Sequence, residues 1–337
     1  MLPPAPPLDE RTGLDARSLP EELLRGDEPL VLRGLVADWP AVAAARAGDA
    51  EISRYLLRFY RGEPVRANIG PPEIGGRFFY NDDLSGFNFG IANERLDNLL
   101  TALAKSRDDA RAPAIYMGAT AVDRWLPGFR AENALDLGGR QPLVSAWLGN
   151  RSRVSAHQDV TDNIACVVAG RRRFTLFPPS QLQNLYVGPL DYTPAGQAVS
   201  LVDLHSPDLQ RFPRFEEAWK HARVAELGPG DAIFIPTLWW HHVEALSDFN
   251  LLVNFWWRGA PSHLESPMSA LMLAMLALRD LPQAQRREWQ EIFRHYVFEA
   301  DDGTSAHIPE KARRVLAPLT EAGARELRAQ LLQRLGR

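Results

Sequence analysis

Hydrophobic and polar positions divide the chain into a strand-rich middle and a helical end. From residue 114 to residue 257, short apolar runs alternate with Gly, Pro and Asp turns, as in β-strands. After Gly259 the apolar positions recur every three or four residues, as in helices. Strands followed by helices in this order predict a β-barrel or jelly roll with a helical C-terminal appendage.

The individual elements follow from these two periods. We expect strands at Pro29–Val36, Val65–Ile69, Phe78–Tyr80, Ala114–Met117, Leu143–Leu148, Ala232–Ile235, Trp240–Leu246 and Asn250–Trp257, and a hairpin-like pair of strands at Asn163–Val168 and Arg172–Phe177. Helices are expected at Ala41–Tyr60, Arg95–Ser106, Ser266–Arg279, Leu281–Phe298 and Pro309–Leu335. The long, Pro-containing stretch 184–214 is typical of a functional loop.

Composition narrows the class of protein. The 337 residues are 45% hydrophobic, which is an ordinary globular composition, and the net charge of −4 argues against bulk nucleic-acid binding. The single cysteine, Cys166, excludes an intrachain disulfide and fits a reducing compartment. The N-terminal residues lack a signal-peptide pattern, and the longest near-apolar stretch, Pro267–Leu278, is too short for a membrane span. We therefore expect a cytoplasmic protein with no membrane partner.

Candidate chemistry begins with His157 and Asp159. Two residues apart on a strand, their side chains point to the same face. A second histidine follows on a later predicted strand, at His241 or His242. Two histidines and one carboxylate on one face of a metal are the ligands of non-haem Fe(II) oxygenases. The alternative is a surface His–Asp pair with a core histidine, and strand spacing does not choose between His241 and His242, which face opposite sides.

A second candidate is the arginine run after Gly170. Strand alternation places Arg171 and Arg173 on one face and Arg172 on the other. If Arg172 faces the interior, its guanidinium needs an anion, and a dicarboxylate supplies one through a bidentate pair. The alternative is a solvated basic turn.

Several motifs in a fixed order resemble one family. They are Ser155-Ala156-His157-Gln158-Asp159, Gly170-Arg171-Arg172-Arg173-Phe174, Gln210-Arg211-Phe212-Pro213, Trp239-Trp240-His241-His242 and Val253-Asn254-Phe255-Trp256. With weaker matches upstream at Pro29–Pro40, Phe78–Asp82 and Ile115-Tyr116, they cover roughly residues 25–260. The chain resembles the cupin-like Jumonji-C oxygenases, most of all the asparaginyl hydroxylase of hypoxia-inducible factor. The resemblance implies a double-stranded β-helix, mainly β with α, that binds Fe(II) and the cosubstrate 2-oxoglutarate.

The resemblance also assigns residues. It implies His157, Asp159 and His241 as metal ligands, with no further catalytic residue, and Arg172 as the anchor of the cosubstrate carboxylate. Tyr116, Asn163 and Asn254 fall on the family's other cosubstrate contacts. Arg172 stands where the family has lysine, and Val154 where it has threonine. Both departures lie in the cosubstrate pocket and leave the choice of dicarboxylate open.

Three segments are expected: a Pro-rich lead-in at 1–24, with an α/β region following it, a Jumonji-C domain at 25–260 and a helical region at 261–337. Helix Ser266–Arg279 is apolar on most sides, so it is buried in the fold or in a homodimer, as the family implies. The expected activity is O2-dependent hydroxylation of a protein or peptide side chain. The alternatives are a small molecule or amino acid as substrate, more distantly a modified tRNA base, or a non-catalytic cupin-like metal-binding regulator.

Overall fold

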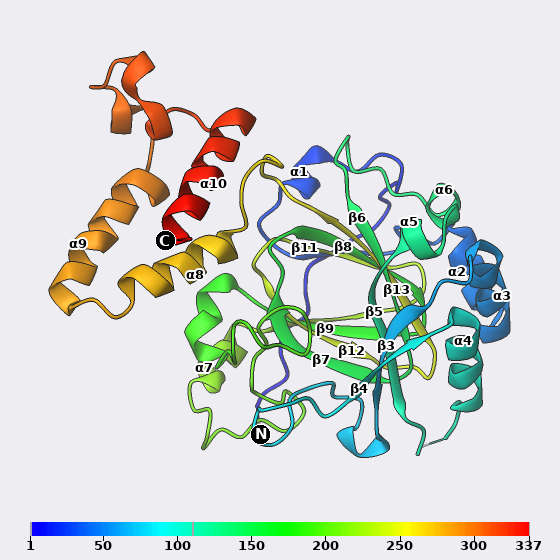
Figure 1. Ribbon diagram of the computed structural model, residues 1–337. Coiled ribbons are helices and arrows are strands. Elements are labelled where there is room, and N and C mark those ends of the chain that lie inside the picture. The colour runs from blue at the N-terminus through cyan, green and yellow to red at the C-terminus, as the bar shows by residue number, and fades with distance from the viewer. Residues whose placement is uncertain (1, 110, 337) are drawn as a thin grey trace. The chain divides into compact units, whose positions relative to one another are not determined.

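The computed structural model describes residues 2–109 and 111–336 (Figure 1). Its contacts divide the chain into two compact units, Met1–Gly259 and Ala260–Arg337. The first unit contains every strand of the described structure, and the second is built from helices and turns.

Two β-sheets form the first unit (Figure 1). The nine-stranded sheet has the order β1 (Glu10–Arg11), β2 (Leu30–Leu32), β11 (Ala232–Ile235), β8 (Asp162–Ala169), β13 (Asn250–Trp257), β6 (Leu143–Gly149), β5 (Ala114–Ala121), β3 (Val65–Gly70) and β4 (Gly90–Glu94). The four-stranded sheet has the order β10 (Arg223–Leu227), β9 (Arg172–Phe177), β12 (Trp240–Ala245) and β7 (Ser152–Gln158). Apart from the pair β1–β2, neighbouring strands are antiparallel.

The sheets face one another across a buried apolar layer. Val167 and Ile233 of the large sheet and Phe174 and Leu176 of the small sheet belong to one core cluster. Successive strands β6 to β9 alternate between the sheets in the pattern large, small, large, small. This is the jelly-roll architecture expected from the sequence, and the fold prediction is confirmed. In this architecture, side chains from both sheets point into the space between them.

Short helices cover the outer face of the large sheet (Figure 1). They are α1 (Glu21–Leu24), α2 (Pro40–Ala47), α3 (Asp49–Phe59), α4 (Leu96–Lys105), α5 (Val122–Trp125) and α6 (Phe129–Glu132). In α3 the apolar spacing places Ile52, Leu56 and Phe59 on one buried face. The expected continuous helix 41–60 is broken at Gly48, whose φ of 130° no other residue adopts easily.

The outer face of the small sheet is covered by the segment between β9 and β10. It contains a 3-10 turn at Pro179–Asn184 and helix α7 (Phe215–Lys220). Phe177 and Trp240 on the sheet pack against Leu185 and Phe215 of this segment. The stretch 184–214, expected to be irregular, has no regular helix or strand of its own.

Three further predictions of local structure are wrong. Strands β8 and β9 are not a hairpin, because Gly170, with φ of 73°, turns the chain from one sheet to the other. Phe78–Tyr80 makes only an isolated bridge, Tyr80 with Phe87, instead of a strand. The helix expected over 309–335 is confined to α10 (Glu321–Leu335), since 3-10 turns and Pro318 occupy the stretch before it.

The second unit contains α8 (Pro267–Leu278), α9 (Gln283–Phe293) and α10. None of the residues of α8 or α9 is buried, although α8 is apolar on most sides. Leu271, Met272 and Leu276 of α8 are 44%, 44% and 79% exposed. Large apolar patches of this kind mark interaction surfaces.

Within the described residues, no helix combines the length and the apolar composition that a membrane span requires.

Candidate metal centre

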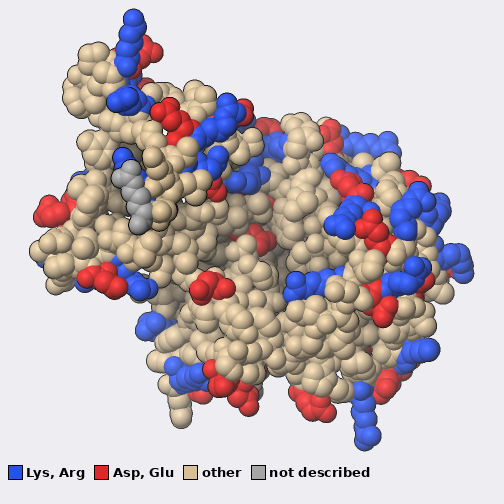
Figure 2. Space-filling model, in the orientation of Figure 1, with Lys and Arg blue, Asp and Glu red and all other residues tan. Residues whose placement is uncertain are grey.

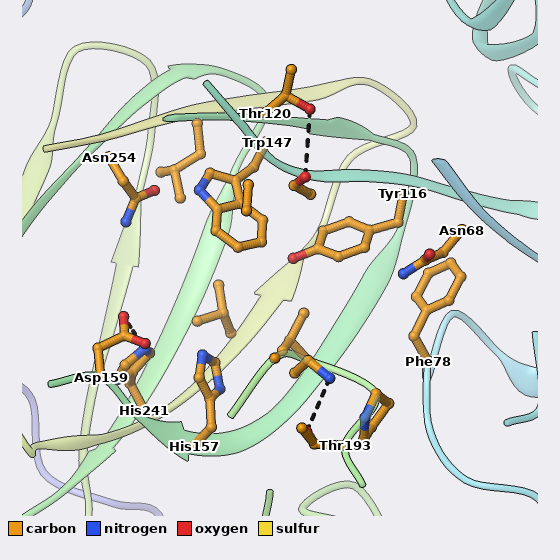
Figure 3. A pocket seen from close by; sticks show the side chains of 18 of the residues that line it. Asn68, Phe78, Tyr116, Thr120, Trp147, His157, Asp159, Thr193, His241 and Asn254 are labelled. Carbon is orange, nitrogen blue, oxygen red and sulfur yellow. Dashed lines mark hydrogen bonds and ion pairs between the residues drawn. The ribbon is translucent and has the colours of Figure 1, made fainter. Parts of the chain in front are cut away.

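Three potential ligands converge at one end of the space between the sheets (Figure 3). His157 lies on β7, Asp159 directly follows this strand, and His241 lies opposite His157 on β12. One ligand atom from each residue lies within 4.8 Å of the other two. The His157 and His241 ring centroids are 4.3 Å apart, and His241 Nε2 lies 3.7 Å from Asp159 Oδ2. Two imidazoles and one carboxylate this close together could hold one metal ion, with the ligand types of a facial triad.

Backbone contacts orient both imidazoles for this role. The Nδ1–H of His157 donates to the Ser155 carbonyl at 2.9 Å, and that of His241 donates to the Trp239 carbonyl at 3.0 Å. Each ring therefore keeps its Nε2 lone pair for a metal. Burial, with His157 alongside, lowers the pKa of His241, so the ring is neutral at pH 7, as a ligand must be. The donor set fits a divalent transition metal.

His242 lies on the opposite face of β12. It is buried, and its two ring nitrogens have no hydrogen-bond partner among residues 2–109 and 111–336. Burial lowers its pKa to about 3. The structure thus brings His241, and not His242, to His157 and Asp159. Strand spacing alone left this choice open.

The same cavity contains Arg172, which is 3% exposed. Its Nη2 donates to the Trp147 carbonyl at 3.4 Å, its Nε has no partner, and no described carboxylate pairs with it. Burial lowers the pKa of Arg172 to about 10, which leaves it charged at neutral pH. Its neighbours Arg171 and Arg173 face outward and pair with Glu226, as strand alternation predicts. A buried cation without a counter-ion marks an anion site.

Other polar atoms around Arg172 also lack partners. The indole Nε1 atoms of Trp147 and Trp256 and the Oδ1 of Asn254 are buried and unpaired among the described residues. Asn254 uses its Nδ2 to donate to Asn163 Oδ1 at 2.9 Å. Burial raises the pKa of Tyr116, which therefore keeps its proton as a further donor. This donor-rich environment fits a ligand with several acceptor oxygens.

Trp147 and Trp256 line the cavity, and sequence reasoning missed both. Trp256 lies in the run Phe255-Trp256-Trp257, and aromatic runs of this kind are more often part of a core. One signal was present for Trp256: it is two residues from Asn254, so the two side chains share a face of β13. No comparable signal marked Trp147.

Val154 reaches the cavity through a local irregularity. It and His157 both line the cavity, although residues three apart on a regular strand face opposite sides. A register shift between β7 and β12 explains this, because two residues of β7 lie between the pairs His241–His157 and Val243–Val154, where β12 has only His242. Val154 thus places an apolar side chain in the cavity, at the position where the resemblance implies a threonine.

The cavity has a volume of about 530 Å³, and the three metal ligands and Arg172 are part of its lining. Its outer wall is a series of contacting rings: Tyr116 stacks on Phe78 at 5.4 Å, Phe78 meets Phe89 at 5.4 Å, and Phe89 stacks on Phe87 at 5.2 Å. Residues Thr193–Gly196 of the long segment also line the cavity, and Ala195 packs against the clusters that contain these rings. Figure 3 shows His157, Tyr116, Asn68 and Thr193 around this space.

A jelly roll with two histidines and one carboxylate between its sheets defines a cupin-like protein. The family model described as "Cupin-like domain" matches residues 16–263. The chain belongs to this family.

Curated relatives are consistent with the family. The chain is 28% identical over 264 residues to Lysine-specific demethylase 8 of Xenopus tropicalis, covering 75% of this chain and 54% of that protein. It is 36% identical over 129 residues to Lysine-specific demethylase JMJ31 of Arabidopsis thaliana, covering 36% and 23%. It is 39% identical over 106 residues to tRNA wybutosine-synthesizing protein 5 of Danio rerio, covering 32% and 29%.

The chain therefore spans about half the length or less of these relatives. Their names support the Jumonji-C family of the resemblance. They do not support the closer likeness to the asparaginyl hydroxylase of hypoxia-inducible factor.

Proposed function

We propose that this protein is an Fe(II)- and 2-oxoglutarate-dependent oxygenase that hydroxylates a protein or peptide side chain. The observation that carries the proposal is the uncompensated cation Arg172 in the same cavity as three convergent metal ligands. A dicarboxylate with a 2-oxo group fits both features of the cavity. Its 2-oxo acid group would bind the metal, and its second carboxylate would neutralise the Arg172 guanidinium.

Each residue of the site has a role in this proposal. His157, Asp159 and His241 hold the iron and leave its other positions open. Iron with 2-oxoglutarate would supply O2 activation, coupled to decarboxylation of the cosubstrate to succinate and CO2. Arg172 binds the distal carboxylate.

The remaining lining residues bind and shield the cosubstrate. Tyr116, Trp147 and Trp256 donate hydrogen bonds to its oxygens, and the Asn254–Asn163 pair fixes the side-chain amides beside it. The apolar cavity walls exclude water, which limits side reactions. No side chain is required as a general base.

Succinate formation tests this function directly. The protein with Fe(II), O2, ascorbate and 2-oxoglutarate is expected to produce succinate slowly without substrate and faster with it. If no succinate forms and 2-oxoglutarate does not bind, the proposal is wrong.

We further propose that the second unit forms a homodimer. The support is the exposed apolar surface of α8, with a groove of about 520 Å³ between α8 and α9 lined by Leu271, Met275, Trp289 and Phe293. A second copy presents the same surface, which is self-complementary in a two-fold dimer. Leu276→Arg, at the 79% exposed position, is expected to convert the dimer to a monomer in light scattering. A wild-type monomer would refute the proposal.

A further inference from the structure

One strand edge at the mouth of the cavity is free. The two sheets have four edge strands, β1, β4, β7 and β10. The edge of β10 is covered by the N-terminal segment, since Leu8 N–H donates to Val224 O and Val224 N–H to Pro6 O. The edge of β7 is covered at both ends, by Ser200 N–H donating to Ala156 O and by Arg153 N–H donating to Gly76 O. These two edges cannot pair with another chain.

The remaining two edges differ in their protection. Strand β1 has only two residues, Glu10 and Arg11, both charged and exposed. Short, charged edge strands resist pairing with other chains. Strand β4 has five residues, Gly-Ile-Ala-Asn-Glu, pairs with β3 without a bulge and contains no Lys, Arg or Pro. Apart from its pairing with β3, β4 makes no backbone hydrogen bond in the part of the chain that the structure describes. Apart from the charge of its last residue, Glu94, β4 has none of the features that usually prevent an edge strand from pairing with another chain.

This free edge borders the candidate active site. Tyr116 on β5, Asn68 on β3 and Ile91 on β4 are cross-strand neighbours, and all three line the cavity. Ile91 is 51% exposed. A further strand added beside Ile91 would continue this row, and every second side chain of it would face the side of the sheet on which the cavity lies.

The charged side chains that line the cavity favour a negatively charged substrate. Among the described residues, the charged side chains in the lining besides the histidines are Arg66, Asp159 and Arg172. In the proposed complex, Fe(II) and 2-oxoglutarate cancel in charge, as do Asp159 and Arg172. Arg66, on β3 two residues before Asn68, is exposed, and its side chain has no ion pair or hydrogen bond within the described residues. It is the uncompensated charge of the loaded site.

A polyanion such as a nucleic acid would need more cations than this. On the face shown in Figure 2, basic and acidic side chains are interspersed, without a broad basic field. Phosphate backbones are bound through many Lys and Arg contacts. One arginine beside a free strand edge instead suits a polypeptide with an acidic residue.

We propose that the substrate is an extended acidic segment of polypeptide that adds to the free edge of β4 as a further strand, next to Arg66. This rests on the proposed function and narrows its substrate class. Main-chain hydrogen bonds to β4 provide the affinity, Arg66 selects the acidic residue, and a residue between them enters the cavity past the rings of Phe87 and Phe89.

The test uses a synthetic positional-scanning peptide library and the full chain with Fe(II) and 2-oxoglutarate. Peptides are expected to stimulate succinate formation, with acidic residues enriched at one position. N-methylation of the best peptide is expected to lower the stimulation about fivefold or more at alternate residues, because each lost hydrogen bond contributes about 1 kcal/mol. A pattern with a period of two is the signature of strand pairing.

Charge reversal tests the role of Arg66. Arg66→Glu is expected to reverse the preference between the acidic peptide and its lysine-substituted counterpart. The matched control, Arg61→Glu, changes an exposed arginine outside the cavity lining and should leave the preference unchanged.

Succinate formed without peptide distinguishes the docking proposal from the proposed oxygenase function. If such succinate forms but only small molecules or nucleic acid stimulate it, or if N-methylation has no periodic effect, the docking proposal is wrong and the oxygenase stands. If neither turnover nor 2-oxoglutarate binding occurs, both are wrong.

Discussion

Replacing Arg172 by methionine should have opposite effects on the empty and the loaded protein. Arg172 is buried without a counter-ion, and its pKa is lowered to about 10. A depression of this size corresponds to a destabilised cation, by roughly 3 kcal/mol. Water that enters the open cavity screens part of this cost, so Arg172→Met is expected to stabilise the ligand-free protein by about 1–3 kcal/mol.

The stability difference between wild type and Arg172→Met should depend on pH, because burial lowers the pKa of Arg172. Below pH 10 the guanidinium is charged in both the folded and the unfolded chain, so its burial cost is fully present at neutral pH. Above pH 10 the folded protein releases the proton and the cost declines. The stability advantage of Arg172→Met should therefore shrink as the pH rises through 10.

Binding of 2-oxoglutarate should change in the other direction. Loss of a buried charge pair costs about 3 kcal/mol, which corresponds to a roughly 100-fold increase in Kd. Arg172→Lys keeps the charge and should bind more tightly than Arg172→Met. Arg173→Met is the matched control, because Arg173 lies on the outer face and pairs with Glu226.

Urea denaturation with and without 2-oxoglutarate measures both effects on the same samples. The expected result is a more stable ligand-free variant that the cosubstrate no longer stabilises. A variant that is less stable than wild type when ligand-free, yet keeps its affinity for 2-oxoglutarate, would refute the reasoning.

Three further predictions concern single side chains. His157→Ala and Asp159→Ala should lose Fe(II) binding in metal analysis, whereas His242→Ala should largely keep it. Loss of Fe(II) binding in His242→Ala with binding kept in the other two variants would show that the metal ligands are assigned wrongly. Trp147→Phe should raise the KM for 2-oxoglutarate about fivefold, through one lost hydrogen bond, with kcat little changed. Gly170→Ala should lower the free energy of unfolding by about 1–2 kcal/mol or more, because its φ is positive and a Cβ would lie 2.4 Å from Phe249 O; an unchanged denaturation midpoint would contradict this.

The sequence predicted those parts of the site that depend on strand periodicity. His157 and Asp159 share a face because they are two apart, and Arg172 points inward because its neighbours point outward. The pairing of His157 with His241 needed the register of β7 against β12. Such long-range register is not encoded in a local period, which is why the resemblance, and not the spacing, had to select His241.

Other features depend on tertiary context. The bulge that brings Val154 into the cavity has no local signal, since Ser155 and Ala156 fit a regular strand equally well. Strand β4 was missed because Gly, Ala, Asn and Glu have low strand propensity, and its pairing with β3 overrides that preference. The aromatic run Phe78–Tyr80 has high strand propensity, yet its rings pack in the cavity wall and in a neighbouring cluster instead of pairing in a sheet.

The most direct test of the central claim is a calorimetric titration of 2-oxoglutarate into the Fe(II)-loaded protein without oxygen. The account predicts one binding site per chain, lost on removal of Fe(II) and weakened about 100-fold by Arg172→Met. Binding that is independent of both the metal and Arg172, or no binding at all, would contradict it.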